Sequence, residues 1–184
     1  MTAFTAARRL FCLMMAILLA AAAAACAETE EEAFDWGVDE LTCTRIEGCE
    51  GGAAAPLYAG PTSQFQRIPG AQIDTAQPFL YFGQSDCWAM VGLGSPDAPE
   101  AVGWIEAAAA QLPEQPELLF EDALPLTLPE DVLLSPAPSP SDTAAGLPAG
   151  TPAVLLARFG AWGYLQAEPE EGPIRGFAPL EALR

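Results

Sequence analysis

The segment Asp86-Cys87-Trp88 contains the side chain best suited to covalent chemistry in this sequence. A cysteine attacks as its thiolate, which enzymes usually generate with a nearby histidine. The chain has no histidine and no lysine, and its seven basic residues are all arginines. We therefore interpret Cys87 as a small residue in a turn and predict no catalytic cysteine.

Neighbouring carboxylates such as Glu121-Asp122 and Glu170-Glu171 are of the type that glycoside hydrolysis requires. Because the chain has 25 acidic residues, some of them are expected to be adjacent by chance. Acidic pairs in loops are also usually solvated. The sequence also lacks a glycine-rich phosphate loop of known spacing. A wall hydrolase accessory or a glycosidase is thus the weakest functional interpretation, and we expect no enzyme.

Cys43 and Cys49 enclose five residues and are candidates for a disulfide that closes a small loop. This pairing leaves Cys87 without a partner, and a bond from Cys87 to either of the other two is the alternative. None of the spacings is typical of zinc ligands, and histidine is absent. We therefore predict neither a metal site nor a cofactor.

Aromatic residues are the remaining candidates for a binding function, and two interpretations compete. They could line a groove for a peptide or glycan, in which case Tyr58, Trp88 and Tyr164 are the candidate ligand-binding residues. Alternatively, Trp88, Trp104 and Trp162 fill small barrels as half-buried side chains, because such barrels need large residues. We favour the second interpretation for the tryptophans. Tyr58 is the best groove candidate, since it lies beside a Gly-Pro-Thr-Ser loop.

The N-terminus has the pattern of an export signal over residues 1–27. Arg8 and Arg9 precede an apolar run over residues 10–25, which ends in small residues. A signal peptidase could cleave before Glu28. Alternatively, the segment preceding Cys26 resembles a bacterial lipobox, and a lipidated Cys26 would anchor the mature chain in a membrane. Both outcomes place the protein outside the cytoplasm of a bacterium, as a secreted or cell-surface protein.

The charge of the chain after the signal excludes one class of partner. Five arginines against 25 acids give a net charge of −20 for the residues that follow. Such a chain repels the phosphates of nucleic acids. We expect no nucleic-acid binding, and membrane association only through a lipid anchor.

The distribution of turns predicts an all-β chain with an internal repeat. The 34 glycines and prolines disfavour long helices. Trp88 and Gly103 in the first half correspond to Trp162 and Gly176 in the second, at spacings of 15 and 14 residues. We predict an acidic tether and extension over 28–53, a first unit over 54–107, a Pro-rich linker over 108–127 and a divergent second unit over 128–184.

Each unit resembles a bacterial SH3-like (SH3b) domain. The first contains Leu57-Tyr-Ala-Gly-Pro-Thr-Ser63, Ser85-Asp-Cys-Trp88 and Gly103-Trp104-Ile105; the second contains Leu134-Ser-Pro-Ala-Pro-Ser139, Gly160-Ala-Trp162 and Gly176-Phe177-Ala178. The resemblance implies two small barrels in tandem after a cleaved signal helix. It also implies non-catalytic binding of a cell-wall (peptidoglycan) peptide or of another exported protein. The alternative function is structural, with the two units acting as a scaffold or docking to each other.

Overall fold

The computed structural model describes residues 34–109, 112, 117–140, 145–170 and 172–184. The expected all-β fold is confirmed: the described residues form twelve strands and no α-helix. Two short 3₁₀ turns, η1 (Ala107–Ala109) and η2 (Leu180–Leu183), follow the sixth and the last strand. The predicted signal segment and its helix lie outside the described residues.

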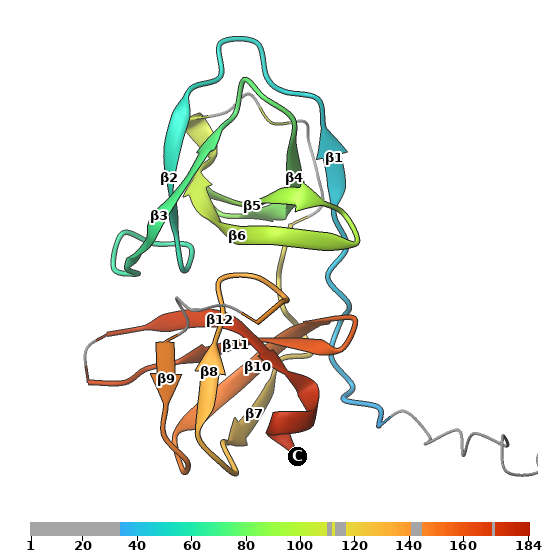
Figure 1. Cartoon of the computed structure of the whole chain (residues 1–184), viewed down its shortest axis with the longest axis vertical. Coiled ribbons are helices and arrows are strands. Elements are labelled where there is room, and N and C mark those ends of the chain that lie inside the picture. The colour runs from blue at the N-terminus through green and yellow to red at the C-terminus, as the bar shows by residue number, and fades with distance from the viewer. Residues whose placement is uncertain (1–33, 110–111, 113–116, 141–144, 171) are drawn as a thin grey trace, which may run out of the picture. The chain divides into compact units, whose positions relative to one another are not determined.

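The first half of the chain forms a six-stranded antiparallel sheet in the order β1-β4-β5-β6-β2-β3 (Figure 1). Its strands are β1 (Thr44–Ile46), β2 (Ala54–Tyr58), β3 (Arg67–Asp74), β4 (Phe79–Ser85), β5 (Trp88–Ser95) and β6 (Ala98–Glu106). Tight turns join β4 to β5 and β5 to β6, which are neighbours both along the chain and in the sheet. Among the described residues, no pairing joins the edge strands β1 and β3 into a closed barrel.

The second half repeats this arrangement in two sheets, one of order β12-β11-β10-β7 and one of order β8-β9. The strands are β7 (Leu124–Thr127), β8 (Val132–Leu134), β9 (Ala145–Leu147), β10 (Pro152–Phe159), β11 (Trp162–Ala167) and β12 (Ile174–Pro179). A bridge from Ser135 to Phe177 places β8 beside β12, as Tyr58 and Trp104 pair β2 with β6. Strands β7–β12 therefore correspond in order to β1–β6.

The register of the strands supports the same correspondence. The β4–β5 pair shifts register between Tyr81 and Gly83, and the β10–β11 pair shifts between Leu155 and Ala157. The edge strands pair with equivalent residues: Thr44 of β1 lies opposite Tyr81, and Leu124 of β7 lies opposite Leu155. Because bulges are specific local features of a sheet, their recurrence indicates one architecture used twice.

The hairpin turns also match. Asp86 and Gly160 both have a left-handed backbone, with φ of 51° and 56°. The amide of Ala107 donates a hydrogen bond to the carbonyl oxygen of Cys87 over 2.7 Å. In the second half, the amide of Leu180 donates in the same way to Ala161 over 2.9 Å.

Each repeat begins earlier than the sequence suggested. Strand β1 lies within the range 28–53, which we had assigned to a tether and extension, and it pairs with β4. Strand β7 lies within the predicted linker, 108–127, and pairs with β10. Both are edge strands of three or four residues, so their pairing depends on distant strands rather than on a local pattern.

Strands β4–β6 are buried on both faces. In β4, Phe79 and Tyr81 face the core of the first repeat, whereas Leu80 and Phe82 face a second cluster. That second cluster contains side chains from both repeats: Leu41, Leu80, Phe82, Met90, Val102, Trp104, Leu156, Ala157, Tyr164 and Phe177. We call it the shared core. It lies between the separate cores of the two repeats, so the repeats are packed together rather than strung on a linker.

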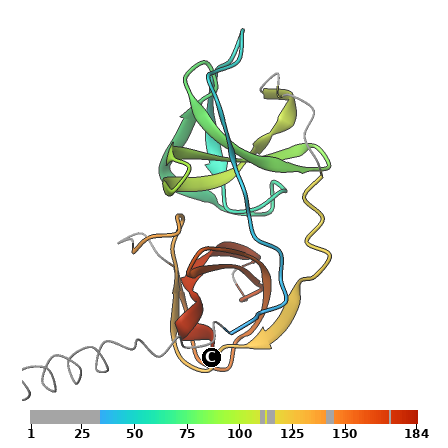
Figure 2. The ribbon, with the colours of Figure 1, turned by 90° about the vertical axis from the view of Figure 1, so that its right-hand side faces the viewer.

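The segments that lead into the two repeats are exchanged. Leu41 precedes β1, yet its amide donates a hydrogen bond to the carbonyl oxygen of Arg158 in β10, over 2.7 Å. Figure 2 shows the blue segment before β1 passing along the second repeat before it enters the first. Leu118 precedes β7, yet its amide donates to the carbonyl oxygen of Gln84 in β4, also over 2.7 Å. Val38 is buried in the core of the second repeat. Each repeat is therefore completed by the segment that leads into the other.

Candidate functional site

Two of the predicted groove residues, Tyr58 and Trp88, lie against each other. Their rings make an edge-to-face contact, with centroids 5.3 Å apart and planes at 81°. Both side chains are half-buried and pack on the margin of the shared core. They come from β2 and β5, which are brought together because β6 lies between them in the sheet. The pair combines apolar ring faces with a polar hydroxyl, as aromatic ligand-binding surfaces require.

Arg67 completes this surface, and the sequence analysis did not single it out. Its Nε donates a hydrogen bond to the Tyr58 hydroxyl oxygen over 3.1 Å. Its guanidinium carbon lies 5.4 Å from the centroid of the Tyr58 ring, which is within the range of a cation–π contact. Tyr58, Arg67 and Trp88 together are called the aromatic surface below.

Tyr164, the third predicted groove residue, lies in the shared core rather than on the aromatic surface. Its side chain is buried in the shared core, and its hydroxyl oxygen accepts a hydrogen bond from Nε1 of Trp104 over 2.8 Å. Burial raises the pKa of this hydroxyl, an effect that the nearby Arg175 charge and the hydrogen bonds from Trp104 and Arg175 partly offset. Tyr164 therefore links the two repeats internally.

The three tryptophans that we expected to be half-buried differ in how deeply the structure buries them. Trp88 and Trp162 are half-buried, as expected, and occupy equivalent positions at the starts of β5 and β11. Trp104 is fully buried, and it packs in the shared core instead of filling the core of its own repeat. The sequence showed that a large ring was needed there but not that a second repeat covers it.

A cavity of about 300 Å³ opens beside the aromatic surface. Both repeats contribute to it, and Arg67 and Arg175 are its charged lining residues. The cavity also includes one face of Tyr164 and of Phe177. None of the described residues that line it is acidic, which is unusual in a chain with so many carboxylates.

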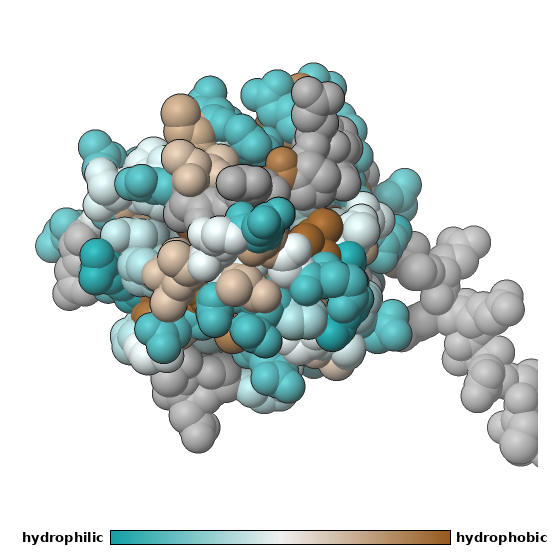
Figure 3. Space-filling view, turned by 90° about the horizontal axis from the view of Figure 1, so that it is seen from above, coloured by the Kyte–Doolittle hydropathy of each residue, from teal (hydrophilic) through white to brown (hydrophobic). Residues whose placement is uncertain are grey.

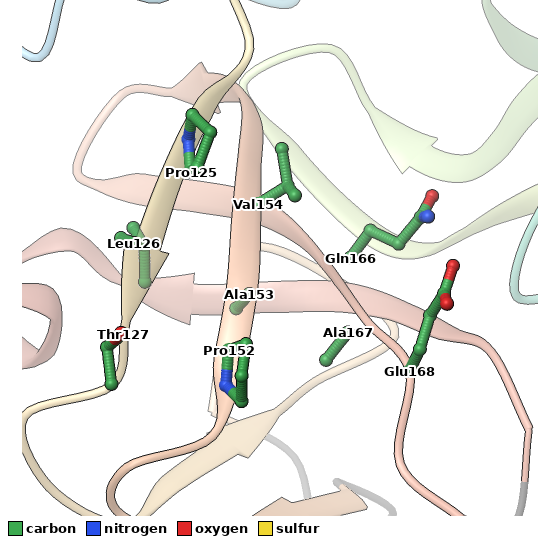
Figure 4. A pocket seen from close by; sticks show the side chains of 9 residues that line it. All are labelled: Pro125, Leu126, Thr127, Pro152, Ala153, Val154, Gln166, Ala167 and Glu168. Carbon is green, nitrogen blue, oxygen red and sulfur yellow. The ribbon is translucent and has the colours of Figure 1, made fainter.

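Two other cavities have no arginine among their described lining residues. A wider one, about 740 Å³, lies over β7, β10 and β11, and Figure 4 shows it lined by mostly small and apolar residues, with Gln166 and Glu168 along one side. A third, about 200 Å³, is bordered by the two lead-in segments and contains Asp39, Glu40 and Glu117. On the face shown in Figure 3, hydrophobic residues are scattered among hydrophilic ones.

The structure does not join the cysteines that we proposed as a disulfide. Cys43, Cys49 and Cys87 are all free thiols, and Cys43 and Cys49 pack on different hydrophobic clusters. Burial, followed by the charge of Asp97, raises the pKa of Cys43. The predicted lipidation site, Cys26, lies outside the described residues.

The described part of the chain has no group of three or more side chains placed to hold a metal ion. Within the same residues, no helix has the length and apolar character needed to span a bilayer. Comparisons with protein-family models, with curated proteins and with solved structures find no match to this chain.

Proposed function

We propose that the chain is a non-catalytic binding protein built from two SH3-like repeats, and that the aromatic surface is its binding site. The observation that carries this proposal is the edge-to-face contact of Tyr58 and Trp88 with Arg67 beside them. An extended peptide can lay its apolar groups on such rings and direct its carbonyl groups to the arginine. The recurring strand order and the paired glycines support the duplicated architecture on which this part of the proposal rests.

The proposed ligand is a cell-wall peptide or another exported protein. This part rests on the export pattern of residues 1–27 and on the strongly negative charge, which suits a soluble protein outside the cell. Mass spectrometry of the mature N-terminus tests it. Either a diacylglyceryl group on Cys26 or a chain beginning at Glu28 is expected, and an unprocessed Met1 would contradict export.

A non-catalytic role is supported by the surroundings of the candidate nucleophiles. Cys87 is exposed in the β4–β5 turn of a chain without histidine, and burial disfavours the thiolate of Cys43. Without a base to activate it, neither thiol is suited to covalent catalysis.

A structural role is the second candidate, and one observation favours it. Ten buried residues, contributed by both repeats, form the shared core. A chain whose repeats dock so closely could serve as a rigid spacer between a membrane anchor and a partner. In this case the aromatic surface would have no ligand.

Sedimentation with purified peptidoglycan separates the two roles. We expect the full chain to pellet with the wall material. Tyr58→Ala should be retained at least about tenfold less, because truncating an aromatic hot-spot residue costs about 2 kcal/mol or more of binding free energy. Leu133→Ala, in an exposed position of the second repeat, is the matched control. Equal retention of Tyr58→Ala would contradict the aromatic surface, and no pelleting of the wild-type chain would favour the structural role.

A further inference from the structure

Arg175 is a partly buried cation that has no carboxylate partner among the described residues. Its Nε donates a hydrogen bond to Oε1 of Gln166 over 2.7 Å, but Nη1 is buried and makes no hydrogen bond. Arg45 and Arg158, in contrast, form ion pairs with Glu47 and Glu40. Leaving a buried donor such as Nη1 of Arg175 unused is unfavourable.

Aromatic rings hold the Arg175 guanidinium in place. Its central carbon lies 5.4 Å from the ring centroid of Phe65 and 5.7 Å from those of both Trp104 and Phe120. Cation–π contacts of this kind fix the position of the group without neutralising its charge. The guanidinium is therefore oriented in advance, which reduces the entropy lost when a ligand binds.

The position of Arg175 is where the two repeats differ. Gly176 follows it in β12 as Gly103 follows Val102 in β6, so Val102 is the equivalent residue of the first repeat. Val102 is buried and apolar, as expected for a packing position. At this position the second repeat has a cation, which supplies a charge to the cavity that Val102 and Arg175 both line.

We propose that this cavity, lined by Arg175 and Arg67, binds the carboxylate of a peptide ligand. This inference rests on the proposed function and adds the chemical class that the site recognises. Guanidinium groups pair with carboxylates through parallel hydrogen bonds. Two arginines in a lining whose described residues include no acid favour an anion locally. A volume of about 300 Å³ accommodates a group of dipeptide size, with the rest of the peptide extending over the aromatic surface.

The negative charge of the whole chain does not prevent a carboxylate from binding in this cavity. At physiological ionic strength, exposed charges are screened over about 8 Å, so distant acids weaken the attraction only slightly. The desolvated contact between guanidinium and carboxylate is screened much less.

The test compares three short peptides with the full chain. N-acetyl-Ala-Ala presents a terminal carboxylate, N-acetyl-Glu-Ala-amide presents a side-chain carboxylate, and N-acetyl-Ala-Ala-amide presents none. Binding is followed through the indole N–H resonance of Trp104, whose ring is in contact with Arg175. We expect at least one of the two acidic peptides to shift this resonance and to bind about tenfold or more tightly than the amide. The acidic peptide that binds more tightly shows whether the carboxylate is that of a chain terminus or of a side chain.

Variants then assign the site. Arg175→Gln is expected to lower the affinity for that acid about tenfold or more, and Arg175→Lys to restore it only in part, because lysine lacks the planar pair of donors. Arg45→Gln removes the same charge from an exposed position outside the cavity and should bind as the wild type does.

Equal binding of acids and amide by the wild-type chain would overturn the carboxylate site while leaving the aromatic surface intact. A Trp104 resonance unmoved by either acid would also overturn it, and neither result depends on whether a variant folds. Retention on peptidoglycan that is lost in Tyr58→Ala but kept in a folded Arg175→Gln would separate the two proposals. That result would confirm the aromatic surface and contradict the carboxylate site.

Discussion

Single residues link the two repeats, and the hydrogen bond between Trp104 and Tyr164 is the clearest case. The two residues are 60 positions apart and come from β6 and β11. Both are buried, so each polar atom needs the other. The sequence suggested a barrel-filling role for Trp104 and a groove role for Tyr164, and the hydrogen bond between them follows only from how the repeats pack.

Removing the Tyr164 hydroxyl should therefore destabilise the fold. Tyr164→Phe leaves Nε1 of Trp104 buried without an acceptor, and we expect the free energy of unfolding to fall by about 1–3 kcal/mol. Tyr58→Phe removes a hydroxyl that accepts from Arg67 at the surface, and a change within about 0.5 kcal/mol is expected. Urea denaturation measures both, and equal losses for the two variants would contradict the assignment.

Alkaline pH should weaken the folded state through the same residue. Burial raises the pKa of Tyr164 in the folded chain, whereas the unfolded tyrosine titrates near its usual value of 10.0. The stabilisation is therefore complete below pH 10 and is lost as the pH rises through the folded-state pKa, because the unfolded chain releases its proton first. Urea denaturation of the wild type at pH 8 and pH 10.5 should show this loss. A smaller loss is expected in Tyr164→Phe, and identical pH dependence in both chains would count against it.

At the scale of elements, close approach of neighbouring strands requires glycine at two equivalent positions. A Cβ added to Gly103 would lie 2.9 Å from Cβ of Leu57, and one added to Gly176 would lie 2.9 Å from Cβ of Leu134. Each glycine thus allows the last strand of its repeat to cross closely over the second.

Alanine at either position should be costly. We expect Gly103→Ala and Gly176→Ala each to lower the free energy of unfolding by about 1–3 kcal/mol, because the backbone must move to accept the methyl group. Gly146→Ala, in the edge strand β9, meets only a side-chain atom at 3.8 Å and is the control. Thermal denaturation of the three variants checks this, and a tolerated Gly176→Ala would argue against equivalent packing in the two repeats.

The sequence predicted the elements that have strong local patterns. Trp88 with Gly103, and Trp162 with Gly176, identified the repeat because a hairpin of fixed length separates them. Strands β1 and β7 were missed, since a strand of three or four residues at a sheet edge acquires its structure from its partner. Arg175 was also missed, although a lone arginine at a position that is valine in the other repeat was a usable signal.

On the scale of the whole molecule, the shared core makes the repeats interdependent. The unbroken apolar run Phe79-Leu-Tyr-Phe82 is the sequence sign of this, because a strand with one solvated face would alternate with polar residues. We had treated 108–127 as a linker between separate barrels. Instead, Leu118 and Phe120 from that range pack against the shared core.

The two repeats should therefore unfold together. We expect one calorimetric transition, with equal calorimetric and van't Hoff enthalpies, because separating the repeats exposes Trp104, Tyr164 and Phe177 to water. Scanning calorimetry of residues 28–184 measures this. Two resolved transitions would mean that each repeat is stable alone.

The exchanged lead-in segments also constrain how the chain is made. Glu40 and Arg158 form an ion pair across 118 positions, and Leu41 bonds to the same strand. On a ribosome that adds about 5–20 residues per second, the early segment waits on the order of ten seconds before its docking strand emerges. Neither half can complete its packing before the strands of the other half are available. The nascent chain therefore remains incompletely folded until its last third has been synthesised.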